Sequence, residues 1–178
     1  PTTFYLAYFD PRISVYDDYE GWDRLPFTEL QEFYNDFSDY ELNVTLPFGY
    51  YMWSTGELQN EKEVLKPAVY NRLQESKKSD SIIHVVTDVD FIQDDFQIPK
   101  PKTWKWKAEN VTDVAFGISN HYLWDATSID VDSVTHRRVS VMAAYNDSSL
   151  DFKYAARVAR FTLDKLSHEL PAVAYPFP

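Results

Sequence analysis

The stretch of sequence that decides the fold runs from Thr103 to Ala126 and reads TWKWKAENVTDVAFGISNHYLWDA. From Trp104 to Lys107, tryptophan alternates with lysine, and this period of two is typical of a strand that buries one face. The two tryptophans therefore share a face and are either both buried or both exposed. Val114 to Ile118 follows as a short, largely apolar run and predicts a second strand.

Further strands are predicted on both sides of this stretch. From Tyr40 to Leu46, aromatic and aliphatic residues alternate with polar ones, and Pro47 ends the pattern. Three more segments have the composition of strands: Tyr50–Ser54, Ser81–Thr87 and Arg138–Tyr145. A turn is predicted at 55–57, directly after the first of these segments. Short strands with turns rich in proline and aspartate indicate a mainly β fold, either an antiparallel β-sandwich or a saddle-shaped sheet.

Two segments interrupt the strand pattern and are predicted as helices, at about 60–78 and 151–170. In the first, Asn60 is a possible N-cap, and the helix proper is expected to begin near Pro67. In the second, Asp151 lies near the beginning, and a proline directly after the segment ends the helix. This helix carries an apolar stripe at helical spacing, formed by Ala155, Val158, Ala159, Thr162, Leu163 and Leu166.

The composition limits the classes of partner. The chain has 178 residues, a length that suits one domain, or one domain together with a small part of a second. Its formal net charge of −11 argues against binding to nucleic acid or to an anionic membrane surface. No apolar run approaches the roughly 20 residues that a membrane span requires. The absence of cysteine excludes disulfides and thiol catalysis and leaves the compartment open.

Two motifs give the chain a resemblance to a known family. Trp104 to Ser119 resembles W-x-x-x-A-E-N-V-x-D-F-A-F-A-x-S, and Thr55 to Asn60 resembles A-T-G-E-L-Q-N. Both patterns are found in secreted bacterial aminopeptidase N-type zinc metallopeptidases. Further matches to this family follow in order along the chain: Tyr8–Pro11, Ile13–Asp18, Gly21–Asp23, Glu32–Tyr34, Asp39–Pro47 and the Tyr175–Pro178 turn.

The resemblance implies that the chain is a fragment of such a peptidase. Residues 1–145 would form the later part of the N-terminal β domain, and 146–178 the linker and first helix of the catalytic domain. The parent protein is expected to be periplasmic or secreted and to hold zinc in the missing part of the catalytic domain. The chain's partner would be the remainder of its own peptidase chain. In the whole enzyme, the β domain would help to shape the cleft for peptide N-termini.

The activity of this family requires the motif H-E-x-x-H on a helix, which supplies two zinc ligands and a general base. The chain has one His-Glu pair, His168-Glu169, but Ala172 occupies the second ligand position and Pro171 would break the helix. The exopeptidase motif G-x-M-E-N is absent. The spacing of the other histidines, which are His84, His121 and His136, does not suit a metal site. We therefore predict no catalytic, cofactor-binding or metal-binding residue and expect the chain to be inactive alone.

Two acidic clusters suggest a cation site, because carboxylates are ligands of hard cations. The first is the loop from Asp17 to Asp23, and the second comprises Asp88, Asp90, Asp94 and Asp95. The first loop departs from EF-hand spacing, so we interpret it as a solvated turn whose carboxylates cap backbone amides. Paired carboxylates also occur in glycosidases, but no motif of that class is present.

The aromatic residues leave an alternative function open. Five tryptophans, 13 tyrosines and 12 phenylalanines would suffice for a platform that stacks on sugars. On that interpretation the chain is a surface carbohydrate-binding β-sandwich module. We favour packing, because aromatic side chains in strands more often form the core or cross-strand pairs. The exposure of Trp104 and Trp106 decides between these two interpretations.

Overall fold

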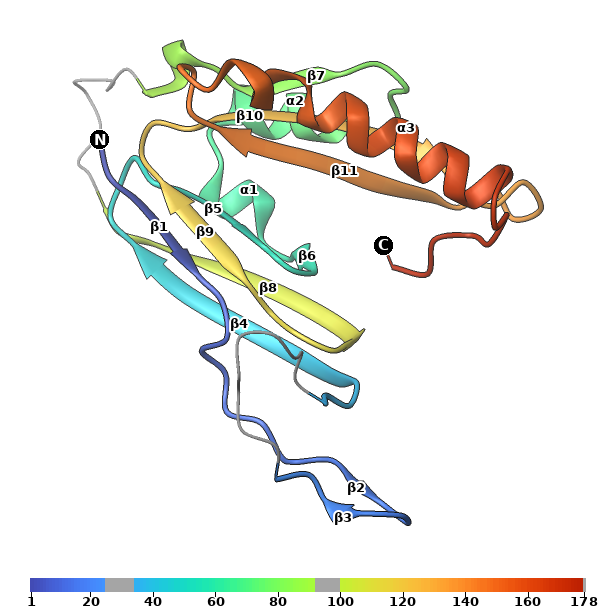
Figure 1. The fold of residues 1–178 in the computed structure, drawn as a ribbon. Coiled ribbons are helices and arrows are strands. Elements are labelled where there is room, and N and C mark those ends of the chain that lie inside the picture. Colours follow the sequence, from blue (N-terminus) through green and yellow to red (C-terminus); the bar gives the residue numbers. More distant parts are fainter. Residues whose placement is uncertain (25–33, 92–99, 178) are drawn as a thin grey trace.

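The computed structural model describes residues 1–24, 34–91 and 100–177, and its fold is mainly β, which confirms the predicted fold class (Figure 1). The helices are α1 (Glu61–Val64), α2 (Pro67–Ser76) and α3 (Ala155–His168), with 3-10 helices η1 (Asp88–Phe91) and η2 (Leu150–Tyr154). The strands are β1 (Thr3–Leu6), β2 (Tyr16–Asp17), β3 (Gly21–Trp22), β4 (Ser38–Leu46), β5 (Tyr51–Ser54), β6 (Glu57–Leu58), β7 (Ile83–Val86), β8 (Lys102–Val111), β9 (Phe116–Ser119), β10 (Leu123–Asp130) and β11 (Arg138–Tyr145).

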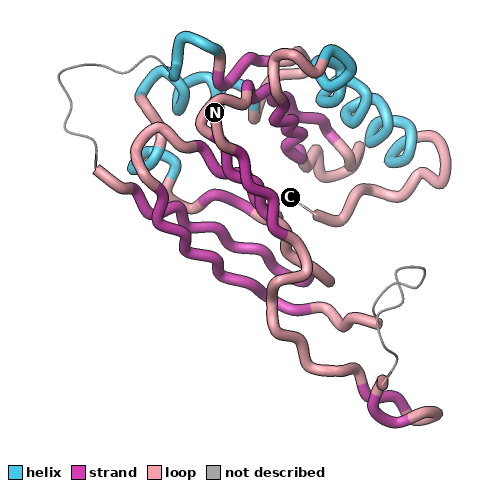
Figure 2. The backbone as a smooth tube through the Cα atoms, turned by 60° about the vertical axis from the view of Figure 1, so that its left-hand side comes forward, coloured by secondary structure: helices cyan, strands magenta, loops and turns pink. Residues whose placement is uncertain are grey.

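The main strands form two layers with the main core between them (Figure 1). One layer contains the antiparallel sheets β1-β9-β5 and β4-β8-β6, and the other contains the antiparallel sheet β11-β10-β7. Helix α3 lies over β10 and β11, and the β2–β3 hairpin projects away from both layers, as Figure 2 also shows. Side chains that are at most 1% exposed mark the centre of the core, among them Met52, Val69, Val85, Trp104 and Trp124.

The pairing of β4 with β8 confirms the strand predicted from the alternation of tryptophan and lysine. Leu42 lies opposite Trp106 in this antiparallel pair. Trp104 and Trp106 face the core and are 1% and 3% exposed, whereas Lys105 between them is exposed. Because a buried indole ring cannot stack on a sugar, the packing interpretation of these two tryptophans is confirmed.

Strand β10 is the main element that the sequence analysis missed. It lies between β7 and β11, and all of its residues from Trp124 to Ile129 are buried. The main core covers one face and α3 covers the other, so its sequence LWDATSID shows no alternation of apolar and polar residues. The other predicted strands agree with the structure apart from shifts at their ends, whereas β1, β2, β3 and β6 were not predicted.

The single helix predicted at about 60–78 is divided into α1 and α2, and the division has a local cause. The residue before a proline avoids the helical region of backbone dihedral angles. Accordingly, Lys66 has φ −66° and ψ 150°, and Pro67 begins α2 at a position where its missing N–H is tolerated. The expectation that the helix proper begins near Pro67 is confirmed.

The connection from β5 to α1 is fixed against β8 by two residues. Gly56 has φ +89°, and a Cβ atom there would lie 2.2 Å from the Lys107 carbonyl oxygen. Asn60 occupies the N-cap position of α1, but its side chain makes no capping bond. Its amide group instead donates to the Thr103 carbonyl oxygen at 2.9 Å and accepts from the Lys105 N–H at 3.1 Å. The predicted N-cap position of Asn60 is therefore confirmed, but its side chain joins the beginning of α1 to β8 instead of capping the helix.

Helix α3 agrees in position with the helix predicted at 151–170, but the face by which it docks on the sheet shares only Leu163 with the large side chains of the apolar stripe. Ala156 and Ser167 are buried, and between them Arg160 donates to the Ser128 carbonyl oxygen at 3.2 Å. Small side chains and this bond allow the helix to approach β10 closely. Of the apolar stripe, Leu163 packs against β10 and β11. Three large apolar side chains of α3 remain exposed: Val158 (58%), Phe161 (60%) and Leu166 (47%).

Candidate functional site

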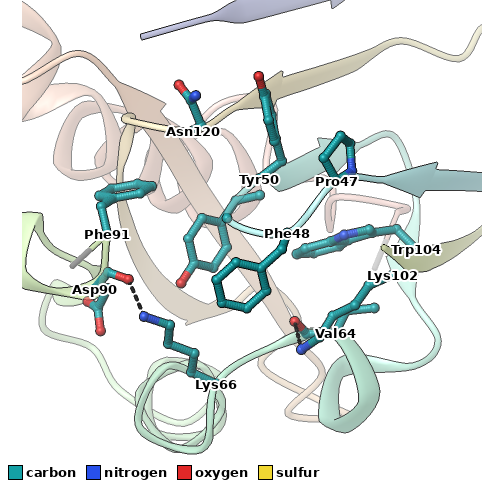
Figure 3. Close-up of a pocket in the computed structure, with 12 residues that line it drawn as sticks. Pro47, Phe48, Tyr50, Val64, Lys66, Asp90, Phe91, Lys102, Trp104 and Asn120 are labelled. Carbon is teal, nitrogen blue, oxygen red and sulfur yellow. Dashed lines mark hydrogen bonds between the residues drawn. The ribbon is translucent and has the colours of Figure 1, made fainter. Parts of the chain in front are cut away.

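A pocket of about 230 Å³ lies where the β4–β5 loop meets the α1–α2 junction and the beginning of β8 (Figure 3). We call it the two-lysine pocket, because Lys66 and Lys102 both line it. Half of the remaining lining residues are aromatic, and two are polar: Phe48, Tyr50, Tyr51, Phe91, Trp104, Asp90 and Asn120. Its volume is below the roughly 300–1,000 Å³ of typical ligand sites, so it suits a small ligand.

Short connections position this lining. The chain turns between β4 and β5 at Gly49, whose φ of +87° favours glycine, and Phe48 precedes the turn. Lys66 is the second of two extended residues between α1 and α2, and Lys102 is the first residue of β8. The 3-10 helix η1, after β7, supplies Phe91. Segments far apart in the sequence thus converge on one cavity.

The two ammonium groups are held by backbone carbonyl groups (Figure 3). Lys66 donates to the Asp90 carbonyl oxygen at 2.6 Å, and Lys102 donates to the Val64 carbonyl oxygen at 2.9 Å. Burial lowers the pKa of Lys102, and the positive charge of Lys66 lowers it further. The pocket therefore brings two cations into repulsive proximity at a partly buried site.

The carboxylate of Asp90 is already engaged by other donors. It accepts from Arg72 at 2.5 Å and from the N–H and hydroxyl of Thr87 at 2.8 Å and 2.9 Å. Burial acts to raise the pKa of Asp90, but these donors outweigh burial and lower it. Burial and the charge of Asp90 raise the pKa of Tyr51, so its hydroxyl stays protonated at neutral pH.

The His-Glu pair lies at the end of α3. His168 is the last residue of the helix, and its Nε2 atom lies 2.9 Å from the Asp130 carbonyl oxygen. Glu169 pairs with Lys165. Ala172 lies beyond the helix with φ +62°, so positions 168 and 172 do not share a helical face. The geometry of two zinc ligands on one helical turn is not formed here.

The first acidic cluster forms the β2–β3 hairpin. Asp17 Oδ1 accepts from the backbone N–H groups of Tyr19 and Glu20 at 2.9 Å and 2.7 Å. Gly21 closes the turn with φ +76°. The interpretation of this loop as a turn whose carboxylate caps backbone amides is therefore confirmed for Asp17.

The second acidic cluster is only partly described. Asp88 and Asp90 belong to η1, whereas Asp94 and Asp95 lie outside the described residues. The Glu32–Phe33 part of one family match and Pro178 also lie outside them. In residues 1–24, 34–91 and 100–177, no three His, Cys, Asp or Glu side chains come together as a group that could hold a metal ion.

A buried carboxylate on the second layer forms another polar cluster, with residues from β7, β10 and β11. The Asp125 side chain is 3% exposed and lies 2.6 Å from Nδ1 of His84, whose side chain is 70% exposed. The Tyr145 hydroxyl donates to Asp125 at 2.9 Å, and burial together with this bond raises the pKa of Tyr145. A carboxylate can orient an imidazole for proton transfer or metal binding, but no third ligand joins this pair within the described chain. We therefore interpret His84 and Tyr145 as partners that satisfy a buried carboxylate.

No protein-family model, curated protein or solved structure matches this chain. None of the helices in the described part is long and apolar enough to cross a membrane. The function is therefore inferred from the residues and their geometry.

The sequence analysis did not find the two-lysine pocket, because its lining comes from segments spread between positions 47 and 120. One signal was present in the strand alternation. Lys102 lies two positions before Trp104 and therefore on the same, core-facing side of β8. A lysine on the core side of a strand is uncommon unless its ammonium group has a partner. The sequence could thus have identified Lys102 as an unusual core-facing lysine, but it could not have identified the residues that surround Lys102.

Proposed function

We propose that this chain is a non-catalytic, mainly β domain of a secreted or periplasmic zinc aminopeptidase of the aminopeptidase N type. In the whole enzyme it helps to shape the cleft that receives peptide N-termini. Residues 1–145 belong to the later part of the N-terminal β domain, and residues 146–178 form the linker and first helix of the catalytic domain. Zinc is held by the rest of the catalytic domain, which is the partner of this chain.

The contact between the two family-like motifs is the observation that carries this proposal. The motifs at 55–60 and 104–119 are far apart in sequence, yet Glu57 of β6 pairs with Lys107 of β8. Gly56 lies directly against Lys107 and Ala108, and Asn60 bonds to the backbone on both sides of Trp104. When residues are in such close contact, the effect of a substitution at one of them on stability depends on the identity of the other. The two matches are therefore better explained as one structural unit of a shared domain than as independent coincidences.

A partly buried ionic cluster joins further matched segments. The Asp10 side chain is 8% exposed and accepts from the Tyr40 hydroxyl at 3.1 Å and from Arg12 at 3.3 Å. Arg12 also pairs with Asp113 at 2.6 Å. Burial and the bond to Asp10 raise the pKa of Tyr40, so the phenol remains a donor. The matches at 8–11, 39–47 and 104–119 thus meet at one site, which supports a common domain.

The exposed face of α3 supports the assignment of a partner within the parent protein. Three of its apolar side chains are between 47% and 60% exposed: Val158, Phe161 and Leu166. Apolar groups that gather on an exposed surface commonly mark an interface. In the whole enzyme, helices of the catalytic domain cover this face.

The proposal is tested by comparing this chain with the natural polypeptide that contains it. We expect the chain alone to hydrolyse no aminoacyl p-nitroanilide and to retain no stoichiometric zinc after dialysis, because no ligand follows His168 on its helix. The natural polypeptide is expected to hydrolyse these substrates and to lose its activity on treatment with a chelator. Zinc bound tightly by the short chain, turnover abolished by His168→Ala, or a zinc-free inactive natural polypeptide would each contradict the proposal.

Amide hydrogen exchange tests the assignment of α3. At concentrations where the chain is monomeric, we expect α3 to exchange faster than β7, because one face of the helix lacks cover. Phe161→Ala should leave the stability of this chain within about 0.5 kcal/mol, yet destabilise the natural polypeptide, where the side chain is covered. Equal protection of α3 and β7 in the isolated chain, or equal effects of Phe161→Ala in both proteins, would remove the support for a missing partner.

A further inference from the structure

We propose that the two-lysine pocket binds a small carboxylate with an apolar body, of the size of phenylacetate. The inference is independent of the peptidase assignment. It rests on the combination of two ammonium groups and an aromatic lining in one small cavity (Figure 3).

The charges of the pocket favour an anion. The Lys102 ammonium group has three N–H donors and a single acceptor in the described protein, the Val64 carbonyl oxygen. It is partly buried and is repelled by Lys66. The nearby Asp90 carboxylate is paired with Arg72 and accepts from Thr87, and Lys102 makes no ion pair with it among the described residues. An incoming carboxylate would accept charge-assisted hydrogen bonds and reduce the repulsion between the lysines.

The remaining lining favours an apolar body on the ligand. The Tyr51 ring makes edge-to-face contacts with Phe91, at a centroid distance of 5.5 Å, and with Trp104, at 6.3 Å. These contacts hold the aromatic walls in place before a ligand enters. A bare inorganic anion would leave the aromatic surface unused, whereas a volume of about 230 Å³ has room for one ring or a short alkyl chain. The Tyr51 hydroxyl adds a polar group to this apolar wall.

Nuclear magnetic resonance titration of the chain with phenylacetate at neutral pH tests the proposal. We expect saturable shifts at the backbone amides of 48–51 and 102–104, with millimolar or tighter affinity. Phenylacetamide has nearly the same shape without the charge, so it should bind about tenfold more weakly or worse. Inorganic phosphate should be similarly weak, because it lacks the apolar body.

A pair of lysine variants on one strand provides a matched control. Lys102→Gln is expected to weaken phenylacetate binding by about tenfold or more. Lys105→Gln makes the same change in net charge on the opposite face of β8, where the side chain is exposed, and should leave the affinity unchanged. The spectrum of each ligand-free variant shows whether its fold is intact. A readout without mutation is the pKa of Lys102, which should rise when phenylacetate saturates the pocket.

Two sources of the carboxylate are separated by a peptide probe. Tighter binding of Gly-Gly-Phe than of phenylacetate would assign the site to a peptide C-terminus, and the reverse order to a free acid. The proposal is overturned if phenylacetate causes no saturable shifts at the pocket or if phenylacetamide or phosphate binds equally well. Equal loss of affinity in Lys102→Gln and Lys105→Gln would also overturn it, because the effect would then come from net charge alone.

Discussion

Replacement of Trp106 by alanine is expected to lower the free energy of unfolding by about 3–5 kcal/mol, which urea denaturation at neutral pH will measure. The indole ring is 3% exposed and lies between Leu42 of β4 and Leu58 of β6 across the sheet. Alanine would remove this buried surface and leave a cavity that the paired strands cannot close, because their hydrogen bonds hold the backbone in place. Lys105→Ala, one position away on the exposed face, should change stability by about 0.5 kcal/mol or less.

A phenylalanine variant separates ring packing from polar contacts. The Trp106 indole N–H is buried and has no hydrogen-bond partner among the described residues. Trp106→Phe keeps most of the apolar contact and removes this unsatisfied donor, so it should cost much less than Trp106→Ala. The same alanine variant also tests the carbohydrate interpretation. A stable Trp106→Ala protein that had lost affinity for a polysaccharide would contradict both the burial of the ring and the proposed role of the domain.

Local patterns in the sequence predicted the elements whose cause is local. The alternation from Trp104 to Lys107 identified β8, because one face of that strand is buried and the other is exposed. Pro67 identified the beginning of α2, because a proline constrains the residue before it. Strand β10 escaped prediction, because burial on both faces removes the alternation by which a strand is recognised.

Features that depend on contacts between distant segments could not be read from such patterns. The face by which α3 docks is set by the small residues Ala156 and Ser167, whereas larger apolar side chains on the helix remain exposed. Apolar spacing alone therefore indicates a helix but does not identify the face that this sheet covers. The two-lysine pocket likewise depends on distant contacts, because Lys66 and Lys102 come together only where α1 packs against β8.

Replacement of Gly56 by alanine is expected to lower the free energy of unfolding by about 2–5 kcal/mol. About 1–2 kcal/mol of this arises because φ is +89°, in the left-handed region that residues with a Cβ atom disfavour. The remainder, about 1–3 kcal/mol, comes from overpacking, because the new Cβ would lie 2.2 Å from the Lys107 carbonyl oxygen and 2.8 Å from the Ala108 Cβ atom. The backbone of β8 cannot move aside without disturbing the pairing of Lys107 with Glu41 of β4 and with Glu57 of β6.

Gly49 provides the matched control for this prediction, because it has nearly the same backbone conformation without the crowding. Its φ is +87°, and no atom lies within 4 Å of the position that a Cβ would take. Gly49→Ala should therefore cost only the conformational part, about 1–2 kcal/mol, in the same denaturation experiment. Equal losses in the two variants would show that β6 can move away from β8. The contact between the two family-like motifs would then be loose, and the proposal of a shared domain would lose the observation that carries it.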